Sequence, residues 1–188
     1  MKIFFYIQII FFCQLLAAAT VEFRSDAGKT NFTAIGKPAM IKIQGEGEGP
    51  VGNLIFSKDL VSGTLKVSLD KLSTGIKMRD NHMKNKYLEV EKFPLAELIL
   101  KDVKMPLAVD QWSSEEKSLS FSGDLKMRGK TKPVTGTLAI KKVKNEFQGK
   151  AEFSIEIMKY LETLPDFAGM KVADVVEVKI DLNGKLLP

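Results

Sequence analysis

Cysteine and histidine are nearly absent from this chain. Its 188 residues include one of each, Cys13 and His82. Structural zinc sites use four Cys or His ligands and catalytic zinc sites use three protein ligands, so neither type fits this composition. Asp80, His82 and Glu89 could form only a carboxylate-rich metal site, and their spacing matches no metal-binding motif. A single cysteine also excludes a disulfide within the chain. We therefore expect no metal and no cofactor.

The usual signatures of catalysis are missing as well. A Ser-His-Asp or Cys-His arrangement would have to use His82 as its base, and the sequence contains no G-x-S-x-G motif to supply a nucleophile. The stretch "QGEGEGPVG" (44–52) lacks the Gly-Lys-Ser/Thr ending of a phosphate-binding loop. We expect its glycines to mark a bulge or bend in a curved strand. The sequence thus predicts a protein that is not an enzyme, with a hydrolase or isomerase using His82 as an alternative.

One long apolar run is present, at the N-terminus. In "MKIFFYIQIIFFCQLLAAA" a lysine precedes the apolar stretch and three alanines follow it, which is the pattern of a secretory signal peptide. Residues 3–19 fall short of the ~20 apolar residues of a membrane-spanning helix, and Ile-Phe-Phe before Cys13 argues against lipid attachment. We predict a signal peptide at 1–19, cleavage before Thr20, one domain at 20–188, and a periplasmic or secreted protein.

The charge is mildly basic, with 28 Lys and Arg against 23 Asp and Glu and a formal net charge of +5. We expect no nucleic-acid partner for an exported protein. Basic residues form two groups, which are Lys126, Arg128, Lys130 and Lys132, and Lys77, Arg79, Lys84, Lys86 and Lys92. They are either a solvated surface or a rim that attracts an anionic headgroup or an anionic membrane surface.

Alternation of apolar and polar residues predicts β-strands almost throughout. In the segment 117–129, for example, Leu119 and Phe121 alternate with Ser118, Ser120 and Ser122. The same pattern predicts strands within 40–48, 64–70, 152–158 and 174–182. Shorter strands are expected at 30–35, 51–57, 95–103 and 134–141, which makes eight or nine in all.

Strands with one apolar and one polar face close into an antiparallel barrel or pack as a sandwich. About eight long strands favour an up-and-down barrel that can hold a ligand. The polar faces are rich in Lys, Glu and Asp, so they must face water, whereas a membrane barrel would need an apolar outer face. The residues expected to face the interior and to line an apolar site are Ile41, Ile43, Leu65, Val67, Leu69, Leu119, Phe121, Leu125, Met127, Phe153, Ile155, Ile157, Val176, Val178 and Ile180. Alternation does not decide which of them line a cavity and which fill a core.

Two segments interrupt the β pattern. Residues 79–88 predict one short helix with Asp80 as its N-cap, and 160–170 predict a loop. Arg79, Asp80 and His82 lie close together at the start of this helix. We interpret them as a polar network that fixes the segment, or as a polar rim in contact with a ligand headgroup.

The same residues resemble a known family. Thr74-Gly75, Arg79-Asp80-x-His82-Met83 and the stretch 87–94, "YLEVEKFP", are similar to the signature of the YceI-like, polyisoprenoid-binding family. The later stretch 123–134, with Arg128-Gly129-x-Thr131-Lys132-Pro133, is similar to a second motif of that family. The closing "VADVVEVKIDL" (172–182) resembles its last strand.

This resemblance implies an all-β fold, an extended antiparallel lipocalin-like β-barrel. It implies export in bacteria and binding of a long isoprenoid or similar amphiphilic lipid in the apolar interior, without catalysis. A non-catalytic stress or interaction protein with a filled barrel and no small ligand is the alternative. The oligomeric state stays open, a homodimer being one option.

Overall fold

The structure, a computed structural model, describes residues 18–38, 40–105 and 111–187. The predicted signal peptide lies almost wholly outside these ranges. The barrel strands are β1 (Ala19–Phe23), β4 (Val51–Ser57), β5 (Leu60–Ser68), β6 (Leu95–Lys104), β7 (Lys117–Met127), β8 (Lys130–Val143), β9 (Glu146–Glu156) and β12 (Val175–Leu186). Four further strands are β2 (Lys29–Lys37), β3 (Ile41–Glu48), β10 (Asp166–Phe167) and β11 (Met170–Val172). The helical segments are α1 (Lys77–His82), η1 (Ser25–Ala27), η2 (Leu69–Lys71), η3 (Met83–Leu88) and η5 (Ile157–Lys159).

Eight antiparallel strands close on themselves to form the barrel. Their order is β1-β4-β5-β6-β7-β8-β9-β12, and β12 returns to β1 through the pairs Val21↔Leu186 and Phe23↔Gly184. Each of these strands therefore has a neighbour on both sides, which reduces the risk of intermolecular strand pairing. β6 and β7 pair only from Glu97↔Lys126 to Ile99↔Asp124.

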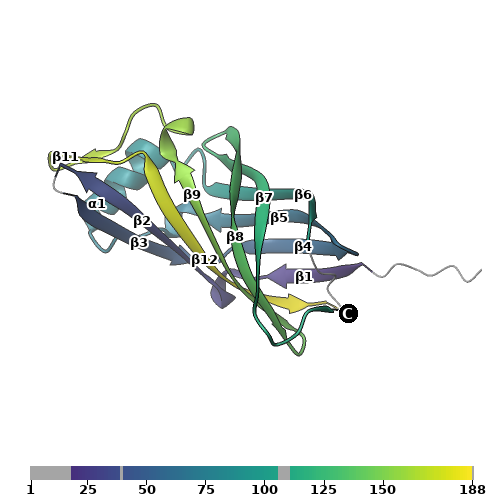
Figure 1. The fold of residues 1–188 in the computed structure, drawn as a ribbon. Helices are drawn as coiled ribbons and strands as arrows, with labels where there is room; N and C mark the ends of the chain where they lie inside the picture. The colour runs from purple at the N-terminus through teal and green to yellow at the C-terminus, as the bar shows by residue number, and fades with distance from the viewer. Residues whose placement is uncertain (1–17, 39, 106–110, 188) are drawn as a thin grey trace, which may run out of the picture.

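The hairpin of β2 and β3 lengthens the barrel at one end (Figure 1). The first half of β12 pairs with β2, from Glu177↔Thr33 to Asp181↔Lys29, before its second half pairs with β1. β3 pairs with β2 and contacts the loop between η2 and α1 through a bridge between Glu46 and Ser73. The barrel is therefore taller on this side, and α1 and β11 lie at the same end.

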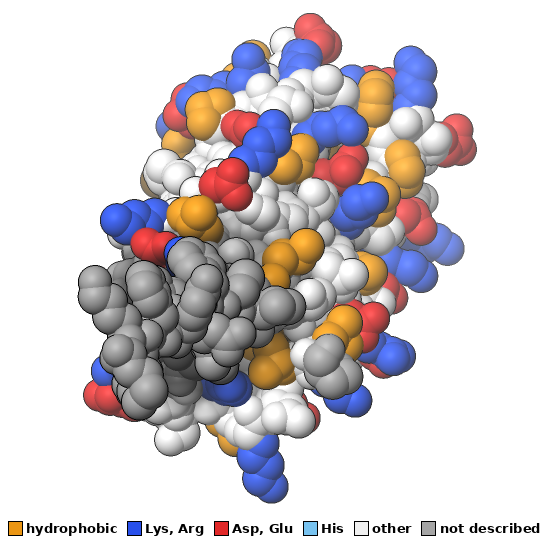
Figure 2. Space-filling view, turned by 90° about the vertical axis from the view of Figure 1, so that its right-hand side faces the viewer, with side chains coloured by type: hydrophobic (Ala, Val, Ile, Leu, Met, Phe, Trp, Pro, Cys, Tyr) orange, Lys and Arg blue, Asp and Glu red, His pale blue; other side chains and the backbone are white. Residues whose placement is uncertain are grey.

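Alternation decides which side of each strand is buried. On β7, Leu119, Phe121 and Leu125 are buried, whereas Ser118 and Ser120 between them are exposed. Outside, ion pairs such as Lys179 with Glu152 link adjacent strands at 3.1 Å. Figure 2 shows acidic and basic side chains interspersed over one face, with hydrophobic ones in small separate patches. The apolar side chains of all eight strands therefore face the interior of the barrel.

Four aromatic rings close the end of the barrel opposite α1. Trp112 packs edge-on against Phe56 at 4.9 Å between ring centroids, and its ring is 5.0 Å from that of Phe147. Phe147 also meets Phe23 edge-on at 5.7 Å. All four side chains are buried. We call Phe23, Phe56, Trp112 and Phe147 the aromatic plug.

The fold confirms the predicted barrel class and each of the predicted strands. The helical segment runs from Lys77 to Leu88 and ends where we expected, but it begins two residues earlier and its last turns are π-helical. Asp80 as N-cap is wrong, because Ile76 occupies that position. A bulge at 44–52 is also wrong for β3, since its pairing with β2 runs without interruption. Gly45 instead leaves room for the ring of Phe32, which lies directly over it.

Candidate ligand site in the barrel

An apolar cavity of about 260 Å³ occupies the barrel interior. Its walls come from β2, β3 and all the barrel strands but β1, together with the segment 69–88 and the loop after η5. At the plug end the lining residues, such as Phe56 and Phe147, are buried. At the α1 end, Arg79, His82 and Phe167 also line the cavity and are half-buried. The cavity is therefore closed at the plug and opens at the α1 end, which we call the mouth.

Most of the residues predicted to face the interior do line this cavity. They are Ile43, Leu65, Val67, Leu69, Phe121, Leu125, Met127, Phe153, Ile155, Ile157, Val176, Val178 and Ile180. Alternation along the strands predicted the position of these side chains, because a shift of one residue in register would turn every one of them outward. Their contact with a ligand stays a prediction.

Two of the predicted positions lie elsewhere. Leu119 is buried in the core but does not line the cavity. Ile41 keeps 48% of its surface exposed, so the expectation that it faces the interior is wrong. It begins β3 next to the hairpin turn and pairs there with Gly36 of β2. Among the described residues, β3 pairs only with β2 at this point, so alternation no longer implies burial.

Other lining residues were not assigned from the sequence. Among them are Phe32, Leu54, Phe56, Leu98, Leu100, Leu138 and Phe147. The short strand that carries both Leu54 and Phe56, β4, was predicted. These two residues alternate with Asn53 and Ile55, and this alternation could have assigned them to the inner face. Phe147 lies near the start of a strand whose first half showed no clear alternation.

A polar network holds the loop between η2 and α1. The Asp80 carboxylate accepts hydrogen bonds from Ser73 Oγ at 2.7 Å, Thr74 N at 2.7 Å and Thr74 Oγ1 at 2.5 Å. Arg79 Nε donates to Thr74 Oγ1 at 2.8 Å, and a second guanidinium nitrogen donates to the Thr74 carbonyl at 3.0 Å. Because Ser73 also pairs with Glu46 of β3 through its backbone, the network fixes the start of α1 against the hairpin.

These hydrogen bonds set the charge state of Asp80. Its side chain is buried, which by itself would raise its pKa. The hydrogen bonds from Thr74 and Ser73, with the charge of Lys84, outweigh that cost and lower the pKa below its usual value. Asp80 is therefore ionised at neutral pH and holds the loop as a carboxylate.

The three predicted polar residues have different positions. Arg79 and Asp80 belong to the network, and Arg79 also lines the cavity mouth. His82 lines the mouth too, but it stacks on Tyr87 at 5.4 Å and meets the edge of Phe167 at 6.1 Å between ring centroids. Among the described residues, the hydrogen bonds of the network join Asp80, Arg79, Ser73 and Thr74, whereas His82 contacts aromatic rings. The expectation that His82 belongs to the network is therefore wrong for this part of the chain.

A second set of polar contacts lies at the mouth, between η3 and the segment 161–172. Tyr87 OH donates to Asp166 Oδ1 at 3.1 Å and accepts from Asp166 N at 2.9 Å. Lys86 Nζ lies 3.6 Å from the same carboxylate. Through these contacts the segment 161–172 is held against η3, and Phe167 rests on His82.

The two family-like motifs meet at one ion pair. Arg128 and Glu89 are hydrogen-bonded, and both adopt positive φ angles, 49° and 48°. Arg128 and Gly129 form the turn of the β7–β8 hairpin, where two positive φ angles suit the twist of the strands. Glu89 ends η3 in the left-handed conformation. The contact therefore ties a helix end to a hairpin turn.

Most of the predicted basic groups are neutralised by acids. Lys126 pairs with Glu97 at 3.1 Å and Lys130 with Glu162 at 3.0 Å. Lys84, Lys86, Lys92 and Arg128 also have acidic partners. In the part of the chain that the structure describes, no three His, Cys, Asp or Glu side chains could together hold a metal ion. Within the same residues, no helix combines the length and apolar character needed to cross a membrane.

Comparison with known protein families identifies the domain. The model of the YceI-like domain matches residues 19–184. The chain belongs to the YceI-like family. No curated protein matches this YceI-like chain.

Solved structures share the fold of this YceI-like protein at low sequence identity. A polyisoprenoid-binding domain from Saccharophagus degradans, implicated in plant cell wall breakdown, has a TM-score of 0.71 and 20% identity, covering 90% of this chain and 98% of its own. Burkholderia cenocepacia BcnA has a TM-score of 0.67 and 15% identity, covering 86% and 99%. A Campylobacter jejuni YceI protein has a TM-score of 0.55 and 12% identity, covering 75% and 84%.

Proposed function

We propose that this protein is a non-catalytic carrier that holds the chain of a long isoprenoid or similar amphiphilic lipid inside its barrel. The observation that carries the proposal is the apolar cavity, closed by the aromatic plug and open beside Arg79 and His82. Membership of the YceI-like family and the similarity to a polyisoprenoid-binding domain support the same ligand class. The apolar tail enters the barrel and a polar headgroup stays at the mouth.

Apolar burial supplies the affinity. Each CH₂ moved from water into the cavity contributes about 0.8 kcal/mol, whereas an exposed ion pair contributes only about 0–1 kcal/mol. Immobilising a flexible chain offsets much of the gain. The tail therefore determines how tightly a ligand binds, and polar groups at the mouth mainly set its orientation.

The alternatives receive less support from the geometry. A filled barrel without a ligand requires a packed interior, but about 260 Å³ is unfilled. A hydrolase using His82 requires a nucleophile and an orienting carboxylate beside the imidazole. The described contacts of His82 are the rings of Tyr87 and Phe167, and the neighbouring Asp80 carboxylate is occupied by Ser73 and Thr74.

Filling the cavity tests the proposal. Ala151 lines the cavity on β9, so Ala151→Phe should reduce uptake of a fluorescent isoprenoid probe about tenfold or more. Ala139→Phe is the matched control, because Ala139 lies on the opposite face of β8 from the cavity-lining Leu138. Val67→Phe, at another lining position, repeats the test if Ala151→Phe fails to fold.

Native mass spectrometry of protein purified from its own host shows whether the barrel is occupied, and mass analysis of the lipid extracted from it identifies the occupant. An empty barrel that takes up no isoprenoid probe, or equal uptake by Ala151→Phe and Ala139→Phe, contradicts the carrier function. We further propose that the protein is exported, on the basis of its N-terminal sequence. N-terminal sequencing should then give Thr20 as the first residue of the mature chain, and a chain retaining Met1 contradicts export.

A further inference from the structure

The mouth is surrounded by exposed apolar side chains. Met78 on α1 is 72% exposed and Met40 at the tip of the β2–β3 hairpin is 64% exposed, the two highest values among the large hydrophobic residues described. Ile41 beside Met40 and Ile76 beside α1 are also exposed. Side chains this apolar are rarely left in water together without a partner. Ile55, beside the plug residue Phe56, is exposed to a similar degree, so the feature that distinguishes the mouth is the pair of highly exposed methionines.

Lysines without an acidic partner among the described residues lie between these apolar side chains. Lys37 and Lys171 face each other across the β2–β11 pair, an arrangement that is unfavourable in water. Lys42 is close to Met40 on one side of the hairpin, where both border a shallow hollow with Lys37. Lys77 lies between Ile76 and Met78. We call Lys37, Met40, Ile41, Lys42, Ile76, Lys77, Met78 and Lys171 the docking rim.

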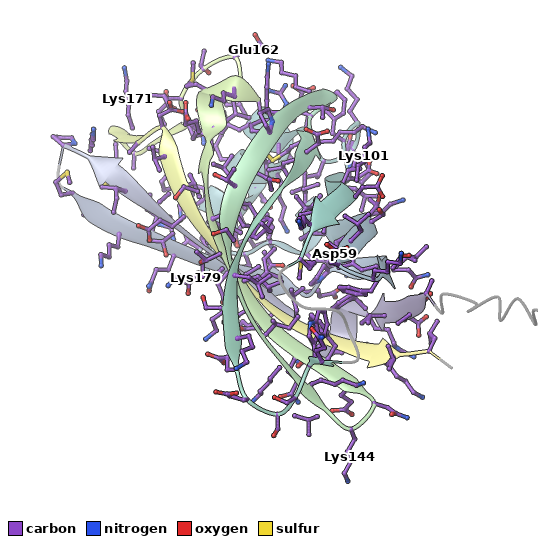
Figure 3. The ribbon with its side chains drawn as sticks, turned by 45° about the vertical axis from the view of Figure 1, so that its right-hand side comes forward. Asp59, Lys101, Lys144, Glu162, Lys171 and Lys179 are labelled. Atoms are coloured by element: carbon purple, nitrogen blue, oxygen red, sulfur yellow. The ribbon has the colours of Figure 1, made fainter. Side chains whose placement is uncertain are left out.

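The three segments of the docking rim enclose one opening. Ala34 and Ile43 of the hairpin, Arg79 and His82 of α1, and Met170 of β11 all line the cavity at this end. In Figure 1 the hairpin tip, α1 and β11 lie together, and Figure 3 shows Lys171 far from Lys144 at the opposite end. The apolar and basic residues of the rim are thus placed around the entrance to the barrel.

We propose that the docking rim binds the surface of an anionic lipid bilayer and sets the cavity mouth against it. This inference rests on the proposed carrier function and adds the surface from which the ligand is loaded or to which it is delivered. Exposed methionine and isoleucine side chains insert among the acyl chains, and lysines pair with anionic headgroups. A lipid tail then passes from bilayer to barrel without crossing water.

The charge pattern favours a membrane over a second copy of this chain. A symmetric dimer through the rim would bring lysines of both copies together, because an isologous interface uses the same patch twice. Glu177 borders the hollow with Lys37 and Lys42. Asp166 lies opposite Lys171 in the β10–β11 pair, but its carboxylate is already bound by Tyr87 and Lys86, so the rim keeps an excess of positive charge. Anionic lipid headgroups supply that balance.

Vesicle co-sedimentation tests the proposal. The protein should bind vesicles of phosphatidylglycerol and phosphatidylcholine more tightly than vesicles of phosphatidylcholine alone, and less tightly as salt is raised. A double variant, Lys37→Gln with Lys171→Gln, should bind the anionic vesicles about 25-fold more weakly, since each lysine near the surface contributes about fivefold. Met40→Ser with Met78→Ser should weaken binding about tenfold or more.

The matched control is Lys101→Gln with Lys144→Gln, two exposed lysines away from the mouth that should leave vesicle binding unchanged. All variants should take up a soluble fluorescent isoprenoid probe as the unmodified protein does. That assay separates failure of docking from failure of the carrier function. Equal binding to neutral vesicles, equal loss in the control, or a dimer through the rim that does not bind vesicles overturns the proposal.

Discussion

At the scale of single residues, Asp80 accepts three hydrogen bonds from Ser73 and Thr74. A hydrolase or isomerase using His82 was the alternative that the sequence left open. The structure instead uses Asp80 to organise the backbone of Ser73 and Thr74, while His82 packs between aromatic rings. Gly75 in the same loop has a φ of +80°, a conformation that favours glycine.

Asp80→Asn should lower the free energy of unfolding at pH 7 by about 1–3 kcal/mol, because it removes hydrogen bonds to a charged acceptor. The pKa of Asp80 is lowered in the folded state. Its stabilisation is therefore fully present above the unfolded pKa of about 3.9 and is lost as pH falls through the folded value. Urea denaturation of the unmodified protein and of Asp80→Asn, from pH 7 down to pH 2.5, measures the difference in their free energies of unfolding. Asn81→Asp, at the exposed neighbouring position, is the control. A difference that does not shrink in acid contradicts the role assigned to the Asp80 charge.

At the scale of elements, the Arg128–Glu89 pair links η3 to the β7–β8 hairpin. Both residues adopt a left-handed backbone that costs free energy for a side chain larger than glycine. Arg128 is 11% exposed in its side chain, so the pair is partly shielded from water. The ion pair offsets the backbone cost at both positions and joins two motifs that are distant in the sequence.

Glu89→Gln should lower stability by about 1–3 kcal/mol, because it leaves the shielded guanidinium of Arg128 without its carboxylate. Arg128→Lys should lose a similar amount, and the double variant should lose less than the sum of the two single changes. Thermal and urea unfolding of the four proteins provide this cycle. The exposed pair of Lys159 and Glu156, 2.8 Å apart, is the comparison and should show coupling below about 1 kcal/mol. Additive losses at Glu89 and Arg128 would exclude the proposed link.

At the scale of the whole molecule, the two ends of the barrel differ: the plug end is tightly packed, and the cavity opens at the mouth end. The plug end is filled by buried aromatic rings, while half-buried residues such as Arg79, His82 and Phe167 line the cavity at the mouth end. A ligand can enter only where the packing is incomplete. The closed end supports the fold and the open end is available for binding.

Phe147→Ala should lower the free energy of unfolding by about 3–5 kcal/mol, because it removes a buried ring in contact with Phe23, Phe56 and Trp112. Phe167→Ala, at the half-buried mouth, should cost less than half of that. Chemical denaturation measures both. Equal losses at the two ends would contradict this division of roles.

The barrel class, the strands and most of the interior face were predictable because alternation with period two is a property of the chain itself. The family motifs at 74–94 and 123–134 were readable in the same way. The short strands β10 and β11 gave no signal, since two or three residues cannot show alternation. The strand β1 was missed although Val21 and Phe23 alternate with Thr20 and Glu22.

The sequence by itself determined the two faces of each strand, and with them an apolar interior. Only the tertiary structure decided that the interior holds a cavity, because packing depends on how Phe147, Trp112 and Phe56 meet across strands distant in sequence. It also decided that Ile41 lies in solvent at the rim rather than inside. Periodicity is local, whereas the volume left inside a closed barrel depends on all its walls together.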